Sequence, residues 1–564
     1  MTSSIVKTTC PYCGVGCGVD ATLKNGNLIA VSGTKNHPAN YGKLCVKGSA
    51  LHETVDHEGR MLTPMINGQP SDWDTSLDYV SDKIQAIIAE HGPDAFAFYV
   101  SGQILTEDYY VANKLIKGFI GTANIDTNSR LCMASAVVAH KRAFGTDTVP
   151  GNYDDLNHAD LVILTGSNLA WAHPIVYQRL AKAKEQNPSL KVVVIDPRKT
   201  ASCDIADLHL PLKPGSDAYL FNGLAHYLIT QDKLDDAFLA SHCNGLDDLK
   251  RVVLDQTLAQ TAKDCDISDT LIREFNELFA NNERVVTLFS QGINQSSSGV
   301  DKGNAIINCH LLTGKIGKPG SAPFSITGQP NAMGGREVGG LANQLAAHMD
   351  FKKPEHIDRV ARFWGATNMA QSEGLKAVDM FDAVADGRIK AIWIMATNPV
   401  VSMPDADRIK AALEACDLVI VSDSQAMTDT SRYADVCFPA TTWAEKDGTV
   451  TNSERFISRQ RGYLPPPGEA KHDWQAMCEV AKRMGYGEAF AYQNSADIFR
   501  EHAQLSGFEN NDERDFDISL LSTLSNEEFN ALDPIQWPVN ASYPKGRARF
   551  FDDGRFFTPD KKAN

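Results

Sequence analysis

The chain has 564 residues, 43% hydrophobic and 22% charged, a composition typical of globular proteins and unlike disordered, collagen-like or coiled-coil chains. Its net charge of −16 lacks the basic footprint of nucleic-acid-binding proteins and disfavours an anionic membrane as a partner. No apolar run is long enough to cross a membrane, and the first residues, MTSSIVKTTC, have neither an apolar signal core nor twin arginines. We therefore expect a cytoplasmic protein of three or four domains.

Four of the twelve cysteines lie in the first 45 residues, in the pattern C-x2-C-x3-C followed by a distant fourth. They are Cys10, Cys13, Cys17 and Cys45. Interspersed glycines let such a loop fold closely around an inorganic core. The pattern favours a four-iron four-sulfur cluster held by four thiolates. A four-cysteine zinc site is the alternative, although zinc ribbons prefer two C-x2-4-C pairs.

Helical and strand patterns alternate along the rest of the chain. Residues 74–91 place their apolar side chains on one helical face and end at Gly92-Pro93. Apolar runs that end in small or polar residues then recur at 95–102, 161–168, 191–196, 284–291, 389–398 and 417–423. This alternation predicts parallel sheets with helices on both faces. Residues 460–475 and 505–535 are rich in proline or acidic residues, and we expect surface loops there.

Polar residues follow several of the predicted strands, where parallel sheets bind their ligands. These strand ends carry Gly166-Ser167-Asn168, Asp196-Pro197-Arg198, Gln291-Gly292, Asn398-Pro399 and Ser422-Asp423. Each could be a plain polar turn, but together they favour a nucleotide-type ligand. The chain has no G-x-x-x-x-G-K-[ST], H-E-x-x-H or well-placed G-x-G-x-x-G motif, which argues against P-loop, metalloprotease and ordinary dinucleotide-dehydrogenase chemistry.

Four motifs in order, CPYCGVGC…GKLCVKG, NIDTNSRLCMASAV, TGQPNAMGGREVGG and AEKDGTVTNSERF, resemble the molybdopterin oxidoreductases, and most of all their assimilatory nitrate-reducing branch. The resemblance covers essentially the whole chain and implies an α/β protein, with a small N-terminal iron–sulfur domain followed by two doubly wound α/β/α domains. The implied domains are 1–62 (cluster), 63–150 with 360–540 (second dinucleotide), 151–359 (first dinucleotide) and 541–564 (a truncated connection to a C-terminal domain that the chain lacks).

The resemblance also implies the cofactors: one four-iron four-sulfur cluster, and molybdenum held by two molybdopterin guanine dinucleotides. Cys132 would be the protein ligand of the molybdenum, and a soft thiolate suits a metal already surrounded by sulfur. Lys47 would lie between cluster and pterin and help electrons to cross, unless it is a solvated surface lysine. Arg336 would draw an anionic substrate to the metal, unless it forms a surface ion pair.

Further cofactor contacts carry over by motif. Pterin contacts would be Gln103, Asn128, Gln291 and Gln295. First-dinucleotide contacts would be Gly166, Ser167, Asn168, Asp196, Pro197, Arg198, Gly215, Ser216 and Asp217. Second-dinucleotide contacts would be Asn398, Ser422, Asp423, Lys446 and Asp473. A carboxylate such as Asp217 can accept a pair of hydrogen bonds from a guanine edge.

Met133 follows Cys132, where formate dehydrogenases of the family usually have a histidine. The resemblance therefore implies reduction of nitrate to nitrite by oxygen-atom transfer. Ferredoxin, flavodoxin or a flavin-containing NADH-dependent subunit would supply the electrons. A formate dehydrogenase-type enzyme and an inactive electron-transfer remnant are the alternatives. Without the C-terminal domain, we expect weak cofactor retention.

Overall fold

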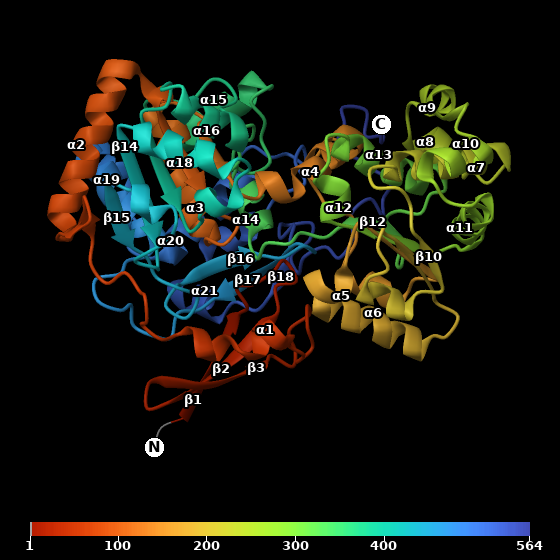
Figure 1. Cartoon of the computed structure of the whole chain (residues 1–564), viewed down its shortest axis with the longest axis horizontal. Coiled ribbons are helices and arrows are strands. Elements are labelled where there is room, and N and C mark those ends of the chain that lie inside the picture. Colours follow the sequence, from red (N-terminus) through yellow and green to blue (C-terminus); the bar gives the residue numbers. More distant parts are fainter. Residues whose placement is uncertain (1–2) are drawn as a thin grey trace.

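The computed structural model describes residues 3–564 and has two α/β lobes above a small N-terminal sheet (Figure 1). That sheet contains β1 (Ser3–Thr9), β2 (Gly18–Lys24) and β3 (Asn27–Gly33), all antiparallel. Pairing of Thr9 with Gly18 closes the loop that carries the first three cysteines, and the Cys10 amide donates to the Cys17 carbonyl at 2.8 Å. The fourth, Cys45, immediately precedes α1 (Val46–Ser49).

A five-stranded parallel sheet forms one lobe, in the order β10 (Leu208–Leu210), β9 (Lys191–Ile195), β8 (Leu161–Thr165), β11 (Val285–Phe289) and β12 (Ala322–Ser325). Alternate side chains of its strands enter two different apolar cores. One core contains residues of α6 (Pro174–Gln186), and the other contains residues of α7 (Asp217–Thr230), α11 (Asp269–Asn281) and α13 (Gly299–Leu312). Helices therefore cover both faces, as predicted.

The second lobe has a seven-stranded sheet in the order β5 (Gln69–Pro70), β4 (Met65–Ile66), β15 (Val436–Pro439), β14 (Leu418–Asp423), β13 (Ala391–Met395), β6 (Phe96–Val100) and β7 (Ile125–Thr127). β4 pairs antiparallel with both β15 and β5, and the other neighbouring strands of this sheet are parallel. One face packs on α2 (Trp73–His91) and α19 (Asp473–Ala481), and the other on α16 (Ala377–Ala385) and α18 (Ala406–Ala415). The predicted helix 74–91 is thus confirmed as α2.

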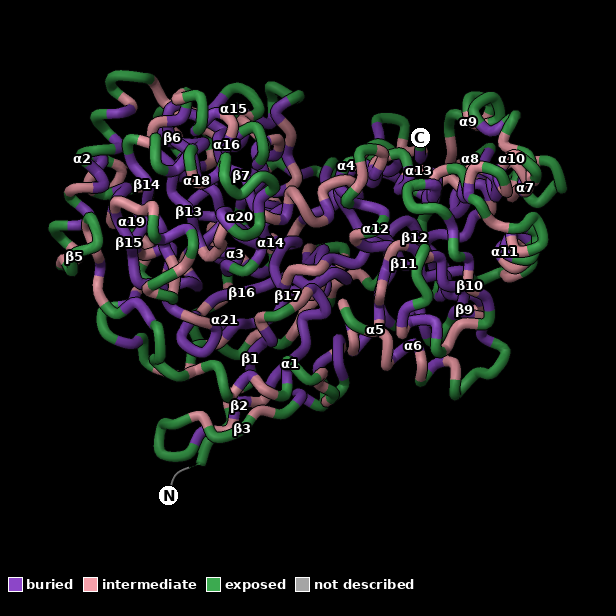
Figure 2. Tube along the Cα trace, in the orientation of Figure 1, coloured by how far each residue is buried: buried purple, intermediate pink, exposed green. Residues whose placement is uncertain are grey.

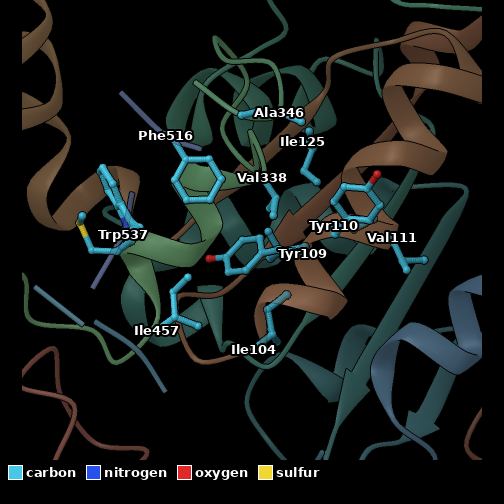
Figure 3. Close-up of a cluster of buried hydrophobic side chains, with 14 of the residues drawn as sticks. Ile104, Tyr109, Tyr110, Val111, Ile125, Val338, Ala346, Ile457, Phe516 and Trp537 are labelled. Atoms are coloured by element: carbon cyan, nitrogen blue, oxygen red, sulfur yellow. The ribbon is translucent and has the colours of Figure 1, made fainter. Parts of the chain in front are cut away.

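Between the lobes lies the antiparallel sheet of β16 (Gly448–Thr451), β17 (Phe456–Gln460) and β18 (Ile535–Gln536). Ile457 of β17 belongs to an apolar cluster that also includes Tyr109, Val338, Phe516 and Trp537 (Figure 3). The other helices are α3 (Thr106–Lys114), α4 (Arg130–Phe144), α5 (Leu169–Ala172), α8 (Asp236–His242), α9 (Leu246–Val253), α10 (Leu258–Cys265), α12 (Gln291–Asn294), α14 (Ala332–Glu337), α15 (Pro354–Trp364), α17 (Pro399–Ser402), α20 (Ser495–Gly507) and α21 (Asn526–Ala531). Buried chain runs through both sheets and the region between them (Figure 2).

The prediction of a surface loop over 505–535 is wrong in part. The segment contains α21, and Phe516 and Ile518 are fully buried. Residues 541–564, predicted as a truncated connection, pack on the rest of the protein: Phe550 and Phe556 are buried, and the Asn564 amide donates to the Ala143 carbonyl. No helix in the described part of the chain is long and apolar enough to cross a membrane.

Candidate functional site

The predicted site residues gather at the carboxyl ends of the parallel strands of both sheets. In the five-stranded sheet, residues 166–168 follow β8, residues 196–198 follow β9, and Gln291 comes two residues after β11. In the seven-stranded sheet, Asn398 follows β13 and Asp423 ends β14. Because neighbouring parallel strands end at the same edge, each sheet presents one polar edge to a ligand.

Cys132 lies in the first turn of α4, which follows β7 of the seven-stranded sheet. Its Sγ is 3.6 Å from Nε2 of Gln291, which follows β11 of the other sheet. The thiol therefore lies where the two lobes meet. Burial raises the pKa of the Cys132 thiol, while the Gly328 backbone, Gln291 and Arg336 oppose this shift because they stabilise a thiolate.

Gly328 lies between the cysteine loop and Cys132 and contacts both. Its carbonyl accepts a hydrogen bond from the Gly14 amide at 3.2 Å, and a Cβ on Gly328 would lie 3.6 Å from the Cys132 sulfur. Gly14 is itself pressed against the body, since a Cβ there would lie 2.3 Å from the Thr327 carbonyl oxygen. Sequence reasoning quoted the motif around Gly328 but missed this residue, because only the fold brings residues 14, 132 and 328 together.

The four N-terminal cysteines lie within electrostatic range of one another. Burial, followed by the nearby Cys13, raises the pKa of Cys10 to about 12, and burial also raises the pKa of Cys13 and of Cys17. A group of thiols whose separate ionisation burial opposes at Cys10, Cys13 and Cys17 suits a cationic core that takes up their charge together. Among residues 3–564, no three Cys, His, Asp or Glu side chains converge tightly enough to hold a single metal ion.

The Lys47 side chain is exposed, and its Nζ lies 5.5 Å from the centre of the Tyr12 ring. Its charge lowers the pKa of Cys10 and Cys13, against the larger effect of burial. It also disfavours protonation of His173, a buried side chain whose Nε2 is 2.7 Å from the Thr327 carbonyl oxygen. Lys47 thus lies close to both the cysteine loop and the body of the protein.

A cavity of about 430 Å³ runs from the cysteine loop along the edge of the seven-stranded sheet. Five predicted residues line it: Gln103, Asn398, Asp423, Lys446 and Asp473. Cys10 and Pro11 also line it, so the cavity reaches the predicted cluster. Sequence reasoning missed a group of further lining residues that includes Thr397, Gln425, Thr428, Thr441, Thr442, Trp443 and Gln460. Of these, only Thr397 had a usable signal, since it directly precedes Asn398 after a predicted strand.

The deepest charges of this cavity are Lys446 and Asp473. Lys446 Nζ is 3.1 Å from Asp473 Oδ2, and Asp473 Oδ1 is buried with no hydrogen-bond partner in the described chain. The Thr442 hydroxyl is also buried and has no hydrogen-bond partner in the described chain. Buried polar atoms are normally hydrogen-bonded, so these orphaned atoms fit a polar ligand such as a nucleotide.

Three of the predicted cofactor contacts also bind protein groups. The Asn128 amide group binds Ser101, Thr397 and Gln329 at 2.7–3.1 Å. The Ser422 hydroxyl accepts from Trp393 Nε1 at 2.8 Å. Gln295 Nε2 donates to the Leu131 carbonyl at 2.8 Å, next to Cys132. These contacts hold the three side chains in place, and whether they also touch a cofactor stays a prediction.

The edge of the five-stranded sheet is more open. Gly166 has φ +55°, and a Cβ there would meet the Gly292 and Ile293 backbone at 2.7–2.9 Å, so only glycine fits. The Ser167 hydroxyl is buried without a partner in the described chain. Asp217, predicted to accept from a guanine edge, has its Oδ2 2.8 Å from Nζ of the buried Lys302. One carboxylate oxygen is therefore already taken.

Arg336 is buried and forms no surface ion pair. Its Nε lies 3.4 Å from Asp147 Oδ2, and it lines a cavity of about 10 Å³ together with Met133 and Thr327. Burial pushes the pKa of Asp147 upward, but the Arg336 guanidinium, with His140 and His348, holds it below its ordinary value. Glu337 is taken by structural contacts, since it accepts from Trp537 and Thr451.

Comparison with known proteins matches the chain to two families. Residues 60–483 match "Molybdopterin oxidoreductase", and residues 3–57 match "Molybdopterin oxidoreductase Fe4S4 domain". A "Nitrate reductase" from Klebsiella oxytoca is 55% identical over 95% of this chain, and one from Shewanella frigidimarina is 49% identical over 99%. The chain spans 61% of the length of each of these relatives. Acetylene hydratase from Pelobacter acetylenicus has a similar fold, with a TM-score of 0.77 and 22% identity, over 99% of this chain and 76% of the other.

Proposed function

The chain belongs to the molybdopterin oxidoreductase family, and from this premise we propose that it reduces nitrate to nitrite. The overall reaction takes up two electrons and two protons and releases nitrite and water. The observation that carries the proposal is the Gly328 bridge, which connects the cysteine loop to the Cys132 thiol. The names of two relatives, both "Nitrate reductase", supply the substrate.

The family takes a molybdopterin and an Fe4S4 cluster. We propose that the cluster is held by Cys10, Cys13, Cys17 and Cys45, and that Cys132 ligates molybdenum. The pterin would carry guanine dinucleotides, with Asp473 accepting from one guanine edge. When bound, such a cofactor supplies the oxygen-atom transfer and stores the electrons.

The chain's own residues would bind and orient the substrate. Arg336 is the positive charge nearest to the Cys132 side of the site, and a buried guanidinium attracts an anion strongly. Met133 lines the same small cavity and leaves helical geometry, with φ −132° and ψ 24°, directly after Cys132. An apolar thioether beside the guanidinium adds no acid or base of its own.

Electrons would enter on the exposed edge of the cluster. Cys13 and Cys45 are half-buried, whereas Cys10 and Cys17 are buried. Val46, next to Cys45, is 83% exposed, and Tyr12, next to Cys13, is also exposed. This edge is where we place the docking of ferredoxin, flavodoxin or a flavin-containing NADH-dependent subunit. The assimilatory, cytoplasmic role belongs to the same proposal.

The test is anaerobic purification of the full chain, quantification of iron, molybdenum and GMP, and a viologen-linked nitrate assay. We expect both metals, and we expect Cys132→Ala to lower nitrate-dependent dye oxidation by roughly 100-fold or more while iron is retained. Cys309→Ala, at a fully buried cysteine on α13, is the matched control and should retain activity. Formate-dependent dye reduction would favour the formate dehydrogenase alternative, and iron without molybdenum would favour the electron-transfer remnant.

A further inference from the structure

Five ionisable side chains that the proposed mechanism leaves largely unused form a buried group between Cys132 and the surface. They are Arg336, Asp147, His140, His348 and Asp515, and their side chains are 0–8% exposed. Burying so many charged groups is costly unless they serve a purpose or are fully hydrogen-bonded. Several polar atoms of this group have no hydrogen-bond partner in the described chain.

The inner end of this group lies beside the proposed substrate site. Asp147 Oδ2 is 3.4 Å from Arg336 Nε, and Asp147 Oδ1 is 3.9 Å from His140 Nδ1. His140 lies on α4, the helix that carries Cys132. The 10 Å³ cavity lined by Arg336 and Met133 is about the smallest space that holds one water molecule.

The outer end reaches a second cavity of about 210 Å³. Asp515 lines it together with the exposed Asp512, Asp553 and Arg555, so it opens to the surface. Asp515 Oδ1 is 2.8 Å from His348 Nδ1 and accepts from the Thr146 hydroxyl at 2.6 Å. Thr146 precedes Asp147 in the chain, so the two ends of the group are adjacent.

The link between the ends contains buried polar atoms that protein groups leave unpartnered in the described chain. Both carboxylate oxygens of Asp147 and both ring nitrogens of His140 are buried without a hydrogen-bond partner in the described chain. Buried atoms of this kind usually bind ordered water. The apolar surroundings, with Phe516 and Trp537 packed 5.4 and 5.7 Å from the His348 ring, would confine that water to the polar path (Figure 3).

His348 occupies the middle of the path in a strained conformation, with φ +56°. The titratable or charged groups that face it are Asp515, Asp147, Glu337 and His502. Burial alone would lower the pKa of His348, but the three carboxylates outweigh burial and raise it above its ordinary value. A histidine whose protonated form is favoured by three neighbouring carboxylates, and which lies between two buried acids, is suited to proton transfer.

We propose that Asp515, His348 and Asp147 relay protons from the surface cavity to the Arg336 side of Cys132. This rests on the proposed nitrate reduction, which consumes two protons per turnover. Each proton that leaves the His348 imidazole is replaced by one from the cavity water through Asp515, so no net charge accumulates. These are positioning and relay residues, because none of them touches Cys132.

The first test measures nitrate reduction by the full, metal-loaded chain carrying His348→Gln or Asp515→Asn, from neutral to alkaline pH. We expect kcat to fall by roughly tenfold or more, since positioned proton transfer typically contributes at least that much. The KM for nitrate should stay within twofold, and the loss should grow as pH rises. The control is His502→Gln, at a buried histidine that stacks on Phe516 at 5.3 Å. Variants with the kcat and pH profile of this control would overturn the relay.

The second test needs no nitrate. Infrared difference spectra on chemical reduction of the loaded protein, in H₂O and D₂O, should show carboxyl and imidazole bands that Asp147→Asn and His348→Gln remove. If both variants keep every isotope-sensitive band, the relay is wrong. If the wild type shows these bands but reduces no nitrate, the relay stands and the proposed substrate fails.

Discussion

Asp473 is the residue whose burial argues most directly for a nucleotide at the edge of the seven-stranded sheet. It offers one free carboxylate oxygen to the cavity, while Lys446 holds the other. Loss of a hydrogen bond to a charged group costs about 1.5–3 kcal/mol, or roughly 10- to 100-fold in affinity. We therefore expect Asp473→Asn to lower the GMP and molybdenum content of the purified protein at unchanged iron. Glu479→Gln, on the same helix but paired outward with Arg483, should retain both; equal loss in the two variants would contradict the assignment.

Residues at strand ends could be predicted from sequence because the strands themselves are visible as apolar runs. Asp423 and Asn398 belong to this class, and both line the cavity. What sequence could not supply is the partner of a polar side chain. The amide of Asn128 accepts from Gln329, 201 residues away, and nothing local distinguishes that contact from a cofactor contact. The buried surroundings of Arg336 and Asp217 were hidden for the same reason.

At the scale of elements, the backbone of Gly14 fixes the cysteine loop to the rest of the protein, since its amide donates to the Gly328 carbonyl at 3.2 Å. The Gly14 carbonyl accepts from the Ser453 amide at 2.9 Å and from the Tyr153 hydroxyl at 3.1 Å. A Cβ at position 14 would lie 2.3 Å from backbone oxygen, so the loop must shift. We expect Gly14→Ala to lower iron content and to slow nitrate-dependent dye oxidation by roughly tenfold, because a cluster site depends on accurate backbone placement.

Gly26→Ala separates this clash from the general cost of replacing a glycine. Gly26 lies in the same domain and, unlike Gly14, has positive φ, +83°, but no atom lies within 4 Å of its added Cβ. Iron content and electron transfer should therefore stay normal in this variant. If Gly14→Ala behaves like Gly26→Ala, the loop is not held against the body as the structure shows.

Elements with a strong local signal were predicted well, and those defined by distant packing were not. The helix at 73–91 has its Asp72 cap, which accepts from the Thr75 amide, and its glycine stop within the segment itself. The acidic segment 505–535 instead owes its order to remote partners, such as Trp537, whose ring lies 5.3 Å from Phe516. Composition alone therefore made an ordered region look like a surface loop.

At the scale of the whole molecule, the two parallel sheets meet at Cys132. Cys132 follows a strand of the seven-stranded sheet, and its partner Gln291 follows a strand of the five-stranded sheet. The seven-stranded sheet takes strands from both sides of the five-stranded lobe in the sequence, so its pairing depends on contacts between residues far apart in the chain. The domain boundaries remain predictions, but the sheet order explains why motifs spread over more than 400 residues converge on one site.

Residues 541–564 close this arrangement by packing on α4, the helix that carries Cys132. The Phe556 ring lies 4.4 Å from that of Phe551 and 5.8 Å from that of Phe144 at the end of α4. Truncation of a buried phenylalanine costs about 3–5 kcal/mol, so Phe556→Ala should lower the urea midpoint of unfolding markedly. Tryptophan fluorescence can follow this, since Trp537 contacts Phe550 of the same segment at 5.7 Å. Leu254→Ala, at a side chain that is 66% exposed, should leave the midpoint nearly unchanged. Equal midpoints for the two variants would show that the segment does not hold α4 in place.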